Sequence, residues 1–151
     1  MPEPRDERRA DFPYSLAVSS RWQDCDAYGH VNNVVYYSWF DTAVTTLLMQ
    51  QRVIWLPDSP TIGLCVESHC RFFAPIEFPE TVDVAVRIAR IGETSVRYEL
   101  AIFREGVDAP AAAGHFVHVM VDRATRRPAP INDAHRAVLQ RVCEAPDVPS
   151  R

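Results

Sequence analysis

The chain of 151 residues suits one domain, and its 47% apolar and 24% charged residues are ordinary for a globular protein. Its formal net charge of −4 argues against nucleic acid as the main partner, because binding phosphate backbones requires a basic face. The four cysteines have no CxxC spacing, which argues against a zinc site. A disulfide framework is not expected either, because no secretory signal indicates an oxidising compartment.

Residues 1–13 are polar and contain prolines, which predicts a disordered N-terminal tail and not a signal peptide. Residues 14–22 have mixed apolar character and predict a first strand. A polar loop that contains a glycine follows over residues 23–31. No apolar run approaches the length that spans a membrane, so we expect a cytoplasmic protein with no membrane partner.

Apolar residues at three- and four-residue steps predict one long helix after this loop. Asn32 and Asn33 precede the stripe and are good N-cap residues, so the helix is expected to begin near them and to end near Gln51. The stripe is wide and aromatic, which indicates burial in a core. It consists of Tyr36, Trp39, Phe40, Ala43, Val44, Leu47 and Leu48.

Beyond a proline-containing breaker at residues 56–60, the apolar period changes to two, which is typical of strands. The alternation predicts four strands, at residues 64–73, 82–89, 96–103 and 115–121. Short turns join these strands, which favours antiparallel neighbours. A short helix is expected over residues 133–143.

One apolar helix and several half-apolar strands can bury each other if the sheet wraps around the helix. The pattern therefore predicts an α+β fold, with an antiparallel sheet around one long central helix, although other α+β folds share this pattern. We expect a single domain over residues 14–145, followed by a C-terminal tail over residues 146–151.

The reactive side chains gather in the loop before the helix, where residues 24–33 hold two carboxylates, an imidazole, a glycine and two amides. The first turn of a helix offers unpaired N–H groups that favour negative charge. Acyl transfer needs an acid–base or nucleophilic group beside such donors, and this loop could supply both. The same residue types are also ordinary in caps and turns, so spacing alone leaves both interpretations open.

Other chemistries find less support in the sequence. It contains no GxSxG elbow, no HxH or HExxH metal motif and no glycine-rich phosphate loop. His69, His115 and His118 fall in strand patterns, which indicates polar cross-strand positions. All 16 basic residues are arginine, a residue that suits bidentate phosphate contacts, so a phosphorylated ligand stays open.

The segment RWQDCDAYGHVNN at residues 21–33 resembles the motif of the 4-hydroxybenzoyl-CoA thioesterase family. The segment RFFAPI at residues 71–76 resembles the central strand and turn of that family, and IGETS at residues 91–95 resembles its next hairpin. The resemblance extends over most of the chain, from residue 14 to residue 131.

This resemblance implies an acyl-CoA thioesterase of the hotdog fold, working as a homodimer or homotetramer with its active site between subunits. It implies that Asp26 is the catalytic carboxylate and that the backbone N–H of Asn33 polarises the thioester carbonyl. His30 and Asn32 match a GHVNN variant of the motif that also resembles plant acyl-ACP thioesterases. We expect His30 to help position the substrate.

The functional hypothesis is hydrolysis of an acyl-CoA to a free acid and CoA, in which Asp26 either attacks the carbonyl or activates a water. No cofactor or metal is expected, because a thioester is already activated. One alternative is an acyl-ACP thioesterase of the same fold. A second is a non-catalytic module that binds acyl-CoA, but such a module has no need of a carboxylate beside the thioester.

Overall fold

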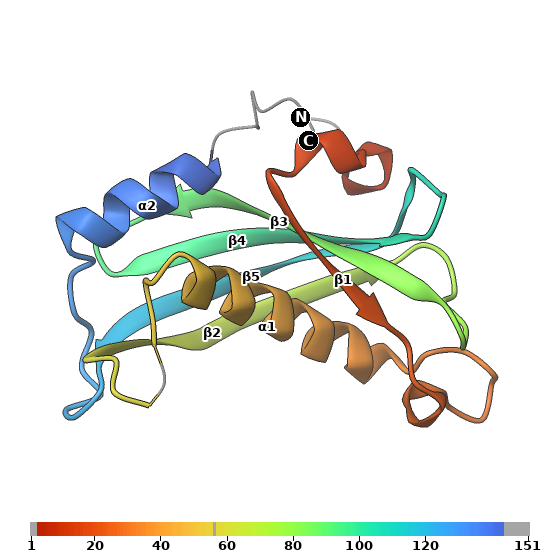
Figure 1. The fold of residues 1–151 in the computed structure, drawn as a ribbon, viewed down its shortest axis with the longest axis horizontal. Coiled ribbons are helices and arrows are strands. Elements are labelled where there is room, and N and C mark those ends of the chain that lie inside the picture. The colour runs from red at the N-terminus through yellow and green to blue at the C-terminus, as the bar shows by residue number, and fades with distance from the viewer. Residues whose placement is uncertain (1–2, 56, 144–151) are drawn as a thin grey trace.

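The computed structural model describes residues 3–55 and 57–143 (Figure 1). Its elements, in chain order, are β1 (Tyr14–Ser19), α1 (Asn33–Gln50), β2 (Thr61–Phe72), β3 (Thr81–Ile91), β4 (Ser95–Arg104), β5 (Pro110–Asp122) and α2 (Asp133–Cys143). The predicted α+β architecture, with one antiparallel sheet and one long helix, is confirmed. The predicted tail over residues 146–151 lies outside the described residues.

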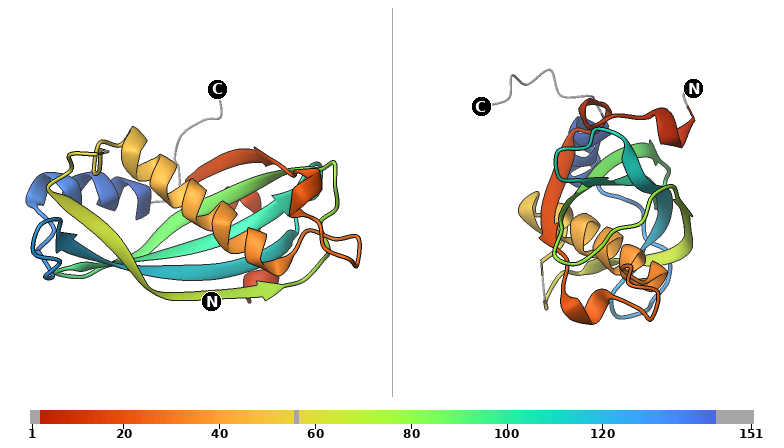
Figure 2. Two further views of the ribbon diagram at one scale, coloured as in Figure 1. Left: turned by 90° about the horizontal axis from the view of Figure 1, so that it is seen from below. Right: turned by 90° about the vertical axis from the view of Figure 1, so that its right-hand side faces the viewer.

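The sheet curves around α1, as the end-on view in Figure 2 shows. The predicted apolar stripe of the helix faces this concave side, and Phe40 and Val44 have no exposed surface. The ring of Phe40 meets that of Phe116 on β5 edge to face, with centroids 5.9 Å apart. The periodicity of the sequence therefore correctly identified the buried face of the helix.

The order of strands in the sheet is β1-β3-β4-β5-β2, which differs from the sequential order that short turns suggested. Only β3, β4 and β5 are consecutive antiparallel neighbours, and β2 pairs with β5 at one edge. The connection from β2 to β3 contains Pro75 and Pro79, and it carries the chain past β5 and β4 instead of closing a hairpin.

A glycine on β5 permits the pairing with β2. A Cβ on Gly114 would lie 1.9 Å from the backbone oxygen of His69 on β2, which is far inside van der Waals contact. The strand β5 also begins at Pro110, earlier than predicted, because Ala111, Ala112 and Ala113 are all buried and show no alternation.

A disordered tail was predicted over residues 1–13, and the structure differs from this prediction within residues 3–13, the part of the tail that it describes. Two short 3-10 helices, Pro4–Asp6 and Arg9–Asp11, lie on the convex face of the sheet. Phe12 is buried there, with its ring 6.0 Å from that of Phe103. The buried Phe12 side chain therefore anchors this polar segment to the sheet.

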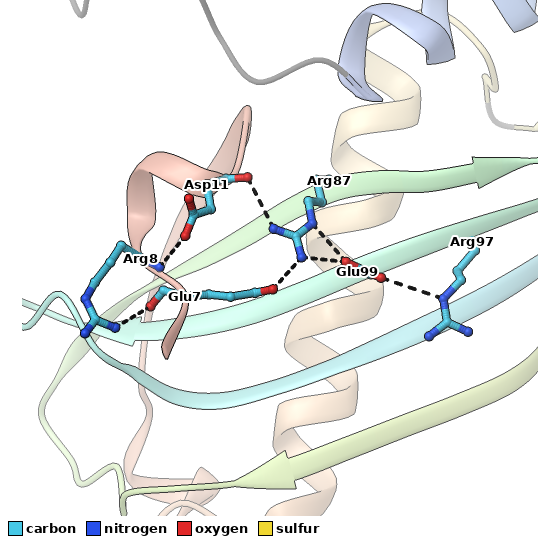
Figure 3. A network of polar contacts seen from close by, with 6 residues as sticks. All are labelled: Glu7, Arg8, Asp11, Arg87, Arg97 and Glu99. Carbon is cyan, nitrogen blue, oxygen red and sulfur yellow. Dashed lines mark hydrogen bonds and ion pairs between the residues drawn. The ribbon is translucent and has the colours of Figure 1, made fainter. Parts of the chain in front are cut away.

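Ion pairs add to this attachment, as Figure 3 shows. Glu7 is only 7% exposed, and its carboxylate lies 2.5 Å from the Arg87 guanidinium, which also contacts Glu99 at 2.6 Å. Burial alone would lower the pKa of Arg87, but hydrogen bonds to these two carboxylates outweigh it and raise the pKa. Composition could not reveal this attachment, because the partners of Glu7 lie far along the chain.

Candidate active site

The loop between β1 and α1 is anchored by Asp24. Its buried carboxylate accepts hydrogen bonds from the Arg21 backbone N–H at 2.7 Å and from the Arg21 guanidinium at 2.8 Å. Burial tends to raise the pKa of Asp24, but the hydrogen bonds and charge of Arg21 outweigh it and hold this pKa below its usual value. The Asp24 carbonyl also accepts from Asn32 N–H at 2.8 Å. Asp24 therefore holds the loop against the start of the helix.

A tight turn fixes Asp26, which is half-buried. Its Oδ1 accepts a hydrogen bond from Tyr28 N–H at 2.9 Å, and its backbone N–H donates to the His30 carbonyl at 2.9 Å. Gly29 completes the turn with a φ of 79°, in the left-handed region that favours glycine. Oδ2 accepts no hydrogen bond from any residue that the structure describes, so it is available to a ligand.

The start of α1 leaves one backbone amide free. Asn32 is the N-cap, and its side-chain oxygen accepts from Val34 N–H at 3.0 Å while its carbonyl accepts from Val35 N–H at 2.9 Å. The N–H of Asn33 donates to no group within residues 3–55 and 57–143. This amide and the helix dipole favour negative charge at the same point.

A pocket of about 590 Å³ brings together the three residues that the sequence singled out, Asp26, His30 and Asn33. Its other lining residues are Tyr28, Val31, Tyr36, Phe72, Phe73, Ala74 and Pro75. The wall formed by residues 72–75 reaches the loop because Val31 N–H donates to the Ile76 carbonyl at 2.7 Å. This wall was not among the site residues predicted from the sequence, although the segment RFFAPI at residues 71–76 resembles the thioesterase family.

Two aromatic rings pack against each other in this pocket. Tyr36 and Phe72 meet edge to face with centroids 5.0 Å apart. Burial raises the pKa of Tyr36 to about 12, so its phenol stays neutral at physiological pH. His30 is exposed at the pocket edge. The site therefore combines a carboxylate, a free amide and an imidazole with an apolar wall.

Asp26 also lines a second pocket, of about 440 Å³. This pocket contains Trp22 and Phe78, whose rings meet edge to face at 5.9 Å, and Trp22 is 76% exposed. Gln23, Cys25 and Gly29 complete its lining. Because Asp26 borders both pockets, an extended substrate could place different parts on either side of its carboxylate.

The remaining histidines do not join this site. His69 and His115 are paired across β2 and β5 with stacked rings 5.3 Å apart, which confirms their predicted cross-strand positions. His115 Nε2 lies 2.7 Å from a Glu67 carboxylate oxygen. Within residues 3–55 and 57–143, no group of three or more His, Cys, Asp or Glu side chains is placed to hold a metal ion.

Comparison with known proteins identifies the family of this fold. The sequence model of the Thioesterase-like superfamily matches residues 20–140. The chain belongs to the Thioesterase-like superfamily. The search of curated proteins found no match to this chain. None of the helices that the structure describes is long and apolar enough to cross a membrane.

Solved structures resemble this superfamily member over most of its length and share its hotdog fold. The PA5185 protein from Pseudomonas aeruginosa strain PAO1 is 44% identical, with a TM-score of 0.87 over 90% of this chain and 95% of that chain. A thioesterase from Thermus thermophilus, solved with coenzyme A and zinc, is 28% identical, with a TM-score of 0.75 over 88% and 96% of the two chains. The BH1999 gentisyl-coenzyme A thioesterase is 26% identical, with a TM-score of 0.74 over 83% and 99%.

Proposed function

We propose that this protein hydrolyses an acyl-CoA thioester to a free acid and CoA, as a member of the 4-hydroxybenzoyl-CoA thioesterase family within its superfamily. The observation that carries the proposal is the pocket shared by the Asp26 carboxylate and the unpaired Asn33 N–H. The carboxylate supplies a base or nucleophile, and the amide supplies a donor for the oxyanion. These are the two groups that acyl transfer requires.

In this mechanism the thioester carbonyl oxygen accepts a hydrogen bond from Asn33 N–H. As negative charge develops on that oxygen, this hydrogen bond becomes stronger and the helix dipole stabilises the charge. One such oxyanion donor lowers the activation free energy by about 3 kcal/mol. The acyl carbon then lies in front of the Asp26 carboxylate. His30, at the pocket edge, has a positioning role toward the substrate.

Two routes are open from this geometry. In one, Asp26 attacks the acyl carbon, CoA leaves as its thiolate, and water hydrolyses the mixed anhydride to regenerate the carboxylate. In the other, Asp26 takes a proton from a water as that water attacks the acyl carbon, and the proton then passes to the departing thiolate. Either route uses the free Oδ2 of Asp26 and yields the same products.

The coenzyme A complex of the Thermus thermophilus neighbour supports CoA over an acyl carrier protein as the thiol half of the substrate. The acyl half is to be identified by a hydrolysis screen over short, long and aromatic acyl-CoAs, with an acyl-ACP included for comparison. A wild-type protein that hydrolyses none of these thioesters would favour the non-catalytic binding module.

The decisive variant is Asp26→Asn, because asparagine keeps the oxygen that accepts from Tyr28 N–H and removes the charge. We expect kcat to fall by at least about 100-fold, the low end for losing a general base, while acyl-CoA binding survives. The matched control is Asp24→Asn in the same loop. It weakens the bond to Arg21 and should lower stability, but it should cost much less in kcat.

Both variants must be checked for folding by circular dichroism and for their oligomeric state. Near-normal turnover by folded Asp26→Asn on the best substrate would show that Asp26 is not the catalytic group.

A further inference from the structure

Two arginines lie against one aromatic ring at the rim of the candidate active-site pocket. The guanidinium carbons of Arg5 and Arg71 lie 5.2 Å and 5.6 Å from the ring centroid of Phe73. Both arginines are exposed, and Phe73 lines the pocket that contains Asp26. Contact with the ring face restrains each guanidinium while leaving its N–H groups free to meet an anion.

The charge at this point is poorly neutralised. Arg71 has one carboxylate near it, that of Glu3 at 3.7 Å, and this pair is exposed. Arg5 has no carboxylate within ion-pair distance among residues 3–55 and 57–143. By contrast, Arg104 close by is paired with Glu80 at 2.5 Å. Of these two cations, Arg71 therefore has one exposed carboxylate near it and Arg5 has none in the described residues, which leaves positive charge available to an external anion.

The pocket surface leads from Asp26 to Arg5, and Arg71 adjoins it through the ring of Phe73. Phe73 and Ala74 line the active-site pocket and also a neighbouring pocket of about 290 Å³, which Arg5 lines as well. The second pocket that Asp26 lines, with Trp22 and Phe78, has no cationic residue in its described lining. A substrate with an anionic end is therefore favoured in only one direction across the site.

We propose that Arg5 and Arg71 bind the phosphate groups of the CoA substrate, with the pantetheine arm crossing the pocket between Asp26 and Phe73. This inference rests on the proposed function. Coenzyme A carries its phosphates at the end remote from the sulfur, and guanidinium groups bind phosphate oxygens through paired N–H donors. The acyl group then lies toward Trp22 and Phe78.

The proposal gives the N-terminal segment a role in substrate binding. Arg5 belongs to the short helix Pro4–Asp6, and the buried ion pair of Glu7 with Arg87 holds that segment on the sheet (Figure 3). The segment thereby brings one phosphate-binding side chain to a site whose other residues come from distant parts of the chain.

The test compares two substrates with the same acyl group, an acyl-CoA and the corresponding acyl-pantetheine, which keeps the thioester and lacks phosphate. Arg5→Ala and Arg71→Ala should each raise KM for the acyl-CoA by about fivefold or more, the scale of a lost charge-assisted hydrogen bond at an exposed site. Values of kcat, and KM for acyl-pantetheine, should not change. Added NaCl should raise the wild-type KM for acyl-CoA, and less so in the double variant.

The matched control is Arg90→Ala, an exposed arginine near the β3–β4 hairpin with no ion pair among the described residues, and its KM values should equal those of the wild type. An unchanged KM for acyl-CoA in folded Arg5→Ala and Arg71→Ala would overturn the inference. So would an equal rise in KM for both substrates, since the arginines would then shape the pocket and not bind phosphate.

Calorimetric titration with CoA separates this inference from the proposed function. If the wild type hydrolyses neither substrate, the proposed function fails. Weaker CoA binding by Arg5→Ala and Arg71→Ala than by Arg90→Ala would still support the phosphate site. Equal CoA binding by all three variants would refute it.

Discussion

Replacement of Phe40 by alanine tests whether the sheet and α1 form one packed core. Phe40 has no exposed surface, and its ring meets those of Phe116 at 5.9 Å and Tyr37 at 6.4 Å. Alanine would remove the ring from the centre of the helix stripe and leave a cavity against β5. Neighbouring side chains on the strands are held by the sheet and can refill that space only in part.

The expected loss is about 4 kcal/mol, the middle of the range for Phe→Ala in a core. Each edge-to-face aromatic pair contributes about 1 kcal/mol beyond the burial of its rings. The loss of these pairs should keep the cost of Phe40→Ala above the low end of the Phe→Ala range. For a domain of this size, each kcal/mol lowers Tm by about 2–4 °C, so we expect a drop of roughly 10 °C. Since a typical domain is stable by about 5–15 kcal/mol, the variant should still fold.

Urea unfolding followed by circular dichroism measures this loss, at several protein concentrations because subunit association would contribute to stability. Met49→Ala is the matched control, since Met49 lies on the same helix and is 45% exposed. Its cost should stay within about 0.5 kcal/mol. If Phe40→Ala costs less than about 1 kcal/mol, the stripe does not face a tightly packed core.

Three further predictions concern the sheet. Gly114→Ala should lower the free energy of unfolding by at least about 2 kcal/mol and speed hydrogen exchange along β2, because a Cβ there meets the His69 backbone oxygen. Wild-type protection of the β2 amides in this variant would contradict the close approach. Burial lowers the pKa of His118, although the nearby charge of Asp41 opposes this shift. The free energy of unfolding should therefore rise with pH between the folded-state pKa of His118 and about 6.5, its ordinary value. In urea unfolding at several pH values, His118→Phe should flatten that rise. The edge strand β2 exposes Val66 and an unpaired backbone, so we expect at least a dimer by light scattering at micromolar concentration, and a monomer would count against it.

The sequence by itself determined the local structure around the site. The apolar period located α1, and Asn32 marked its first turn as the N-cap. Asp26, His30 and Asn33 could be grouped in advance because they lie within eight residues of one another, where a tight turn and a helix start leave few arrangements. The cap also explains in local terms why the Asn33 amide is unpaired.

Only the tertiary structure decided what lies opposite those residues. The second wall of the pocket comes from residues 72–75, which reach the loop through the Val31–Ile76 hydrogen bond. Arg5 reaches Phe73 because the N-terminal segment folds onto the sheet. Such contacts join segments that are remote in the chain, and their formation depends on which strands pair. The alternation of apolar residues marks where strands occur but does not specify their partners, so the place of β2 beside β5 could not be predicted from periodicity.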